Sequence, residues 1–210
     1  MKILNLVFFF AISITINAQI KAITDEGDAV FLFDDGSWEY ENQEIISKSE
    51  IVLNEVPFFK KESSDFLLKS KIMNVGIWLN PKRWSFEKAD DNPSAEYEFK
   101  LKGSDMYGML IAEKIEIPLE TLMEVALING KKSSPDLHII KKEYRIVNGS
   151  KVLLLQLDGT MSGIKFSYYG YYFSSKNGTI QFVTYTSRNL LEGYLEASEE
   201  LLNGLVEINE

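Results

Sequence analysis

Few residues in this chain combine the types and the spacing that catalysis or metal binding requires. His138 is the only histidine and cysteine is absent, which rules out histidine-based metal triads, thiolate zinc sites and cysteine nucleophiles. Ser162 follows Gly159 by three positions, whereas the nucleophile elbow of serine hydrolases needs two. We therefore predict no catalytic residue, no metal ion and no cofactor, and we interpret His138 as a strand residue and Ser162 as part of a turn.

Acidic residues form short clusters at 25–28, 34–35 and 90–91. None supplies the run of alternating oxygen ligands that a calcium loop needs, so turn formation explains the first two. Glu96 and Glu98 share one face of a predicted strand, and a pair of carboxylates is what glycoside hydrolysis uses. Because catalytic carboxylates usually come from separate elements, we interpret both as solvent-facing, and a carboxylate-dependent hydrolase stays an alternative.

Aromatic side chains are concentrated in residues 165–173. Strand alternation places Phe166, Tyr168 and Tyr172 on one face, and Tyr169, Tyr171 and Phe173 on the other. A central strand with a helix on one side explains this pattern. In the alternative, exposed tyrosines stack on sugars or anchor a partner, because each ring joins a flat apolar body to a polar tip. The candidate binding residues are Tyr168, Tyr169, Tyr171 and Tyr172, with Trp38 near the N-terminus.

The N-terminus has the features of an export signal. Lys2 is followed by an apolar run over residues 6–16 and then by Asn17-Ala18, which is the order found in cleavable signal peptides. The apolar run is shorter than the roughly 20 residues that a membrane anchor needs. We predict a signal peptide over 1–18 and a mature protein with no membrane anchor, located in the periplasm or outside a bacterial cell.

The formal net charge of −9 bears on the kind of partner. Nucleic acids and anionic lipids require clustered Lys and Arg, so they are disfavoured, whereas cationic ligands are compatible with this charge. We expect no nucleic-acid partner, and the remaining candidates are an unidentified protein or glycan.

Three regions after the predicted signal peptide differ in their pattern of residue types. Residues 19–41 alternate turn residues with short β-prone runs around Asp35-Gly36, which predicts a β-hairpin module. Residues 42–71 mix charges without a sustained period and are interpreted as a connector, helical from Ser63 onward. Residues 72–210 form the principal domain.

The principal domain alternates strand and turn patterns around a central helix. Turns are expected at Asn148-Gly149, from Asp158-Gly159 onward and at Asn177-Gly178. Amphipathic helices are expected over 118–130 and 188–203, the second with Glu199 and Glu200 on its polar face. The expected strands are 73–79, 84–87, 95–102, 106–115, 137–147, 151–157, 164–174 and 179–186. Tight turns force antiparallel pairing, which predicts an α+β fold with an antiparallel sheet flanked by helices.

The motif Asn80-Pro81-Lys82-Arg83-Trp84 is similar to the proline-x-x-tryptophan strand start of the PsbP-type fold, which the photosystem accessory protein shares with bacterial DcrB-like exported proteins. The order of elements over about 72–206 also resembles this family. The resemblance implies a PsbP-like sandwich and a non-enzymatic accessory, assembly or binding role. Metal-binding residues of the photosynthetic members find no matching positions here.

The prediction is therefore an exported, non-enzymatic binding or accessory protein of the bacterial envelope. Two alternatives stay open. One is the carboxylate-dependent hydrolase acting on cell-wall or carbohydrate material. The other is a structural envelope component whose surface binds nothing specific.

Overall fold

The computed structural model describes residues 20–23, 29–32, 36, 38–40, 49–90 and 92–208. The chain divides into two units, residues 1–41 and 42–210, which are described separately. The predicted signal peptide and the acidic clusters at 25–28 and 34–35 lie outside the described residues.

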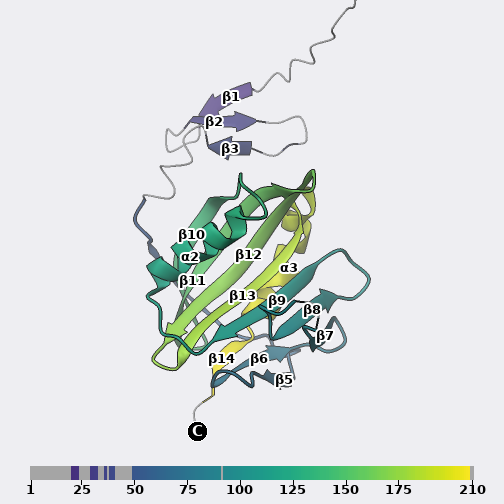
Figure 1. The fold of residues 1–210 in the computed structure, drawn as a ribbon. Coiled ribbons are helices and arrows are strands. Elements are labelled where there is room, and N and C mark those ends of the chain that lie inside the picture. Colours follow the sequence, from purple (N-terminus) through teal and green to yellow (C-terminus); the bar gives the residue numbers. More distant parts are fainter. Residues whose placement is uncertain are drawn as a thin grey trace, which may run out of the picture. The chain divides into compact units, whose positions relative to one another are not determined.

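The N-terminal unit is a small antiparallel sheet of three strands in the order β1-β2-β3 (Figure 1). Its strands are β1 (Ile20–Ile23), β2 (Ala29–Leu32) and β3 (Trp38–Tyr40). The expected hairpin corresponds to β2 and β3, which pair on either side of Gly36, and β1 pairs with β2 as a third strand. Gly36 has a φ of 81°, a conformation that favours glycine.

The second unit contains an eight-stranded sheet in the order β4-β10-β11-β12-β13-β9-β8-β7. Adjacent strands pair antiparallel, as predicted, except that β4 runs parallel to β10. The strands are β4 (Leu53–Phe58), β7 (Trp84–Lys88), β8 (Tyr97–Leu101), β9 (Tyr107–Glu113), β10 (His138–Val147), β11 (Ser150–Met161), β12 (Ile164–Ser175) and β13 (Gly178–Ser187).

One predicted turn begins later than expected. Asp158 and Gly159 lie inside β11, and the chain reverses at Ser162 and Gly163, where φ is 52° and 81°. The interpretation of Ser162 as a turn residue is confirmed. Two consecutive positive φ values are typical of the hairpin turn that matches strand twist. A Cβ at Gly159 would lie 2.3 Å from Ser134 Oγ, so this glycine serves a close approach of the chain rather than a reversal.

A second, three-stranded sheet has the order β14-β6-β5. Its strands are β5 (Phe66–Lys69), β6 (Val75–Leu79) and β14 (Leu205–Glu207). Strands β4 and β5 both fall in the region interpreted as a connector. The helix expected from Ser63 onward is wrong: residues 66–69 pair with β6, where Leu68 is buried. Long-range pairing overrides the weak local pattern here.

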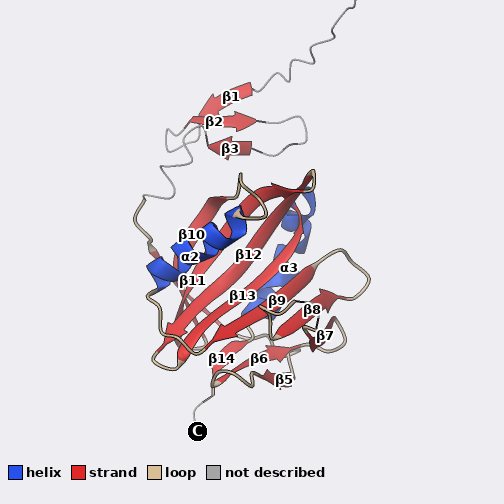
Figure 2. Ribbon diagram, viewed as in Figure 1, coloured by secondary structure: helices blue, strands red, loops and turns tan. Residues whose placement is uncertain are grey.

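Two helices flank the large sheet on opposite faces (Figure 2). Helix α2 (Leu119–Lys131) packs over β11 and β12, and its Leu122 shares a buried core with Leu155 and Tyr172. Helix α3 (Leu191–Leu202), preceded by a 3₁₀ turn (Arg188–Leu190), packs on the other face. There Leu201 shares a core with Phe182 of the large sheet and Ile77 of the small one. The predicted α+β architecture is confirmed.

Candidate functional site

A cleft of about 670 Å³ lies between α2 and the large sheet. The residues of α2 that line it are Val125, Ala126, Asn129 and Gly130. Strands β9, β12 and β13 contribute its other main lining residues, which are Met109, Ile111, Tyr168, Tyr172, Gln181 and Val183. The size and the mixture of apolar side chains with a few polar groups are those of small-molecule sites, which span roughly 300–1,000 Å³.

Strand alternation directs these side chains toward the cleft. Tyr168 and Tyr172 occupy positions of the same parity in β12, with Gly170 between them. Gly170 pairs with Val183 of β13, and a Cβ at Gly170 would lie 2.4 Å from Val183 Cγ1. Glycine therefore allows Val183 to pack closely between the two tyrosines.

The two phenols lack protein partners. Neither Tyr168 nor Tyr172 forms a hydrogen bond with another residue in the described part of the chain. Tyr172 is nevertheless only 3% exposed. Burial raises the pKa of both phenols, and the neighbouring Tyr168 raises the pKa of Tyr172 further. Both hydroxyls therefore stay protonated at physiological pH, and they can donate and accept hydrogen bonds. Neither hydroxyl oxygen is among the fully buried side-chain atoms that lack a partner, so both keep accessible surface that a ligand or water can reach.

The rim of the cleft is acidic. Glu113, at the end of β9, is exposed, and Glu96 lies just before β8. The Glu96 carboxylate accepts a hydrogen bond of 2.6 Å from Ser70 Oγ and another from the Lys71 backbone N–H. Glu96 thus also ties the loop after β5 to the sheet.

A row of aromatic rings continues from the cleft across the same face of the sheet. Tyr168 lies 5.0 Å from Phe166 and 5.6 Å from Tyr185, and Tyr185 stacks on Tyr107 at 5.6 Å between ring centroids. The row ends in a second hollow of about 440 Å³, which includes Glu98. Glu96 and Glu98 therefore line different hollows, whereas a glycosidase needs two carboxyls facing one bond.

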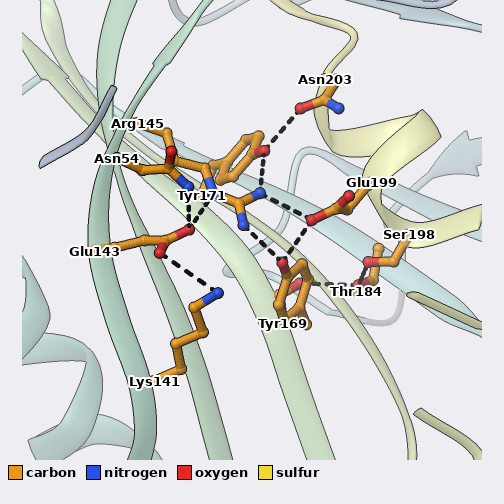
Figure 3. Close-up of polar contacts among 10 residues, drawn as sticks. All are labelled: Asn54, Lys141, Glu143, Arg145, Tyr169, Tyr171, Thr184, Ser198, Glu199 and Asn203. Carbon is orange, nitrogen blue, oxygen red and sulfur yellow. Dashed lines mark hydrogen bonds and ion pairs between the residues drawn. The ribbon is translucent and has the colours of Figure 1, made fainter. Parts of the chain in front are cut away.

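Tyr169 and Tyr171 lie on the opposite face, in a buried polar network centred on Arg145 (Figure 3). Arg145 Nη2 donates to Tyr169 Oη at 3.2 Å, and Nη1 donates to Tyr171 Oη at 3.1 Å. Tyr169 donates to Glu199 at 2.8 Å, and Tyr171 donates to Asn203 at 2.7 Å. Both tyrosines are buried, so they join the sheet to α3.

Two carboxylates complete the charge balance of Arg145. Glu199 accepts from Nη1 at 2.9 Å, and Glu143 accepts from Nε at 2.6 Å. The Phe58 ring lies 4.2 Å from the guanidinium. Burial alone would raise the pKa of Glu143, but the hydrogen bond and charge of Arg145 outweigh it and lower that pKa. Burial raises the pKa of Tyr171 to about 12.

Sequence reasoning missed this network. Glu199 and Glu200 were expected on the polar face of the terminal helix, which is wrong for Glu200. It is only 2% exposed and forms an ion pair with Arg83. The available signal was Arg145 in a strand between the apolar residues Tyr144 and Ile146, with Glu143 two positions before it on the same face, because buried arginines are almost always paired.

The remaining predicted residues are scattered. The backbone of Trp38 lies in β3, and its side chain lies outside the described residues. His138 is buried, with Nδ1 2.8 Å from the Asp136 carbonyl oxygen, and Ser162 lies in the turn between β11 and β12. Within the described ranges, no group of three or more His, Cys, Asp or Glu residues could hold a metal ion. No helix among the same residues is long and apolar enough to span a membrane.

Comparison with solved structures supports the fold. Cyanobacterial PsbP from Synechocystis matches with a TM-score of 0.51 at 11% sequence identity, over 68% of this chain and 91% of that one. A Pseudomonas aeruginosa protein of unknown function gives 0.45 at 14% identity, over 69% and 98% of the two chains. A Bacteroides thetaiotaomicron structure gives 0.45 at 11% identity, over 69% and 48%. No family model and no curated protein sequence matches. The likeness to PsbP shows the predicted fold.

Proposed function

We propose that the protein is an exported, non-enzymatic binding protein that holds a small, largely apolar ligand in the cleft between α2 and the sheet. The observation that carries the proposal is Tyr172, a phenol that is 3% exposed, lines the cleft and has no hydrogen-bond partner among the described residues. The Tyr172 oxygen is not among the fully buried side-chain atoms that lack a partner, so the hydroxyl keeps accessible surface where it lines the cleft. A ligand with a polar group at this point can therefore bond to a hydroxyl that no described residue occupies.

The rest of the cleft supports binding over catalysis. Most of its lining residues are apolar, among them Met109, Ile111 and Val183 on the sheet and Val125 on α2. Apolar walls with a few polar groups suit recognition. Hydrolysis by paired carboxylates is not supported, since Glu96 is bonded to the loop after β5 and Glu98 lines the other hollow.

The arrangement of the aromatic row favours ligand binding in the cleft over sugar stacking on the row itself. Tyr107 and Tyr185 are stacked face to face, and Lys100 Nζ lies 5.2 Å from the Tyr107 ring centroid. Sugars bind tyrosines through open ring faces, and the faces of Tyr107 and Tyr185 are partly occupied by one another. The export half of the proposal depends on the N-terminal pattern of Lys2, the apolar run and Ala18.

Binding is tested with Nile red, a neutral dye whose fluorescence rises in apolar surroundings. The variant Val125→Trp fills the cleft from α2, while Ile128→Trp places the same side chain on the same helix at a residue that is 64% exposed and outside the cleft. We expect saturable binding to the wild type and to Ile128→Trp, and its loss in Val125→Trp. Unchanged binding in Val125→Trp, or none in the wild type, would refute the cleft as the site.

Export is tested by expressing the full chain in a Gram-negative host. We expect the protein in the periplasmic or extracellular fraction, with a mass that corresponds to residues 19–210. Retention of an intact N-terminus in the cytoplasmic fraction would contradict this half of the proposal.

A further inference from the structure

We propose that the cleft selects ligands that join an apolar body to a positively charged head, such as a hydrophobic amine. The inference rests on the proposed function, because it names the ligand class of the same cleft. Four features of the described residues carry it: the charge of the lining, the end of α2, the hydrogen-bonding capacity of the phenols and the shape of the apolar wall.

The charge of the lining is negative. Glu96 and Glu113 line the cleft, and none of its described lining residues is Lys or Arg. One basic group contacts the lining at Lys132, whose Nζ donates to Asn129 Oδ1 at 2.8 Å. Lys71 contributes its backbone N–H to Glu96. One carboxylate, that of Glu113, thus remains exposed at the rim without an ion pair to any described residue.

The C-terminal end of α2 adds to this potential. Asn129 and Gly130 belong to the last turn of the helix and line the cleft. The aligned peptide dipoles place partial negative charge at a helix C-terminus, which favours cations. The N–H groups of Lys132, Ser133 and Ser134 bond to the carbonyls of Asn129 and Gly130, which reduces the effect without reversing its sign.

The groups inside the cleft also suit an ammonium head. An ammonium offers only hydrogen-bond donors, and the phenol oxygens of Tyr168 and Tyr172 are free to accept them from a ligand. Tyrosine rings attract cations through their negative faces. Next to these groups, Met109, Ile111 and Val183 form a wall for an apolar body.

The test uses three probes that share one apolar body and differ only in the head: 3-phenylpropylamine, 3-phenylpropan-1-ol and 3-phenylpropanoate, measured by titration calorimetry. An exposed ion pair and a cation–π contact together predict that the amine binds about tenfold more tightly than the alcohol. We expect the carboxylate to bind more weakly than both. Glu113→Gln should bring the amine within about twofold of the alcohol and leave the alcohol unchanged. Glu124→Gln, on the exposed face of α2 and outside the cleft, should change neither.

The outcomes separate the two proposals. Equal binding of amine and alcohol, or tighter binding of the carboxylate, overturns charge selection while the cleft stands as the site. An equal effect of Glu113→Gln and Glu124→Gln also overturns it, because net charge would then explain the preference. Binding of the alcohol that persists in Val125→Trp instead overturns the proposed function, and the charge inference fails with it.

Discussion

Replacing Arg145 with Met should strongly destabilise the second unit. The Arg145 side chain is 4% exposed and makes ion pairs with Glu143 and Glu199, whose side chains are 16% and 36% exposed. Methionine fills much of the same volume but removes the guanidinium from both carboxylates and both phenols. Glu143 keeps Lys141 and Asn54, Glu199 keeps Tyr169, and Tyr171 keeps Asn203. Removing one partner of a buried pair costs about 3–5 kcal/mol. Because Glu199 retains access to water, we expect the lower end, about 3 kcal/mol.

The assay is urea unfolding followed by tryptophan fluorescence. With a dependence of about 2 kcal/mol per molar urea, a loss of 3 kcal/mol moves the midpoint by about 1.5 M. The matched control is Lys141→Met on the same strand. Lys141 is 46% exposed and lies 3.4 Å from Glu143, so its replacement should cost at most about 0.5 kcal/mol. A loss below about 1 kcal/mol in Arg145→Met, or equal losses in both variants, would show that the network contributes little.

If Arg145→Met does not fold, Tyr169→Phe tests the same argument more gently. It removes one hydroxyl that accepts from Arg145 and donates to Glu199, and it should cost about 1 kcal/mol. No loss in this variant would contradict the assignment of Tyr169 to the network.

Three further predictions concern β12. Tyr172→Phe removes a hydroxyl that has no described protein partner, so we expect the free energy of unfolding to change by less than about 0.5 kcal/mol; a loss above about 1 kcal/mol would reveal an internal bond. Gly170→Ala would place a Cβ 2.4 Å from Val183 Cγ1 and 2.7 Å from the Phe182 carbonyl oxygen. It should lower the free energy of unfolding by about 2 kcal/mol in the same urea assay. A neutral effect would contradict the close packing of β12 on β13. Alkaline pH should destabilise the protein through Tyr171, whose pKa is raised to about 12, compared with about 10 in an unfolded chain. Because the folded protein holds this proton more tightly, the contribution is complete below pH 10 and is lost as pH rises to 12, a change of about 2.7 kcal/mol. Urea midpoints measured across this pH range should fall less steeply with pH in Tyr171→Phe than in the wild type. Equal slopes in the two proteins would contradict the raised pKa of Tyr171.

Much of the fold follows from local signals. Asn148 and Gly149 adopt positive φ at the predicted turn, because these residues accept that conformation at low cost. The apolar stripes of both helices predicted their positions within a few residues, since a helix buries one face. The aromatic strand was correctly expected at the centre of a sheet, with tyrosines of alternate parity on its two faces.

The cleft and the Arg145 network were decided by tertiary structure. Alternation shows that Tyr168 and Tyr172 share a face, but only the position of α2 leaves one phenol buried without a partner and places an acidic rim beside it. Arg145, Glu199 and Tyr169 are distant in sequence and have no shared spacing, and they meet because α3 packs across β12. Residues 53–58 became strand β4 through their pairing with β10. Local propensity reports on neighbours along the chain, whereas burial and polar pairing depend on neighbours that only packing brings together.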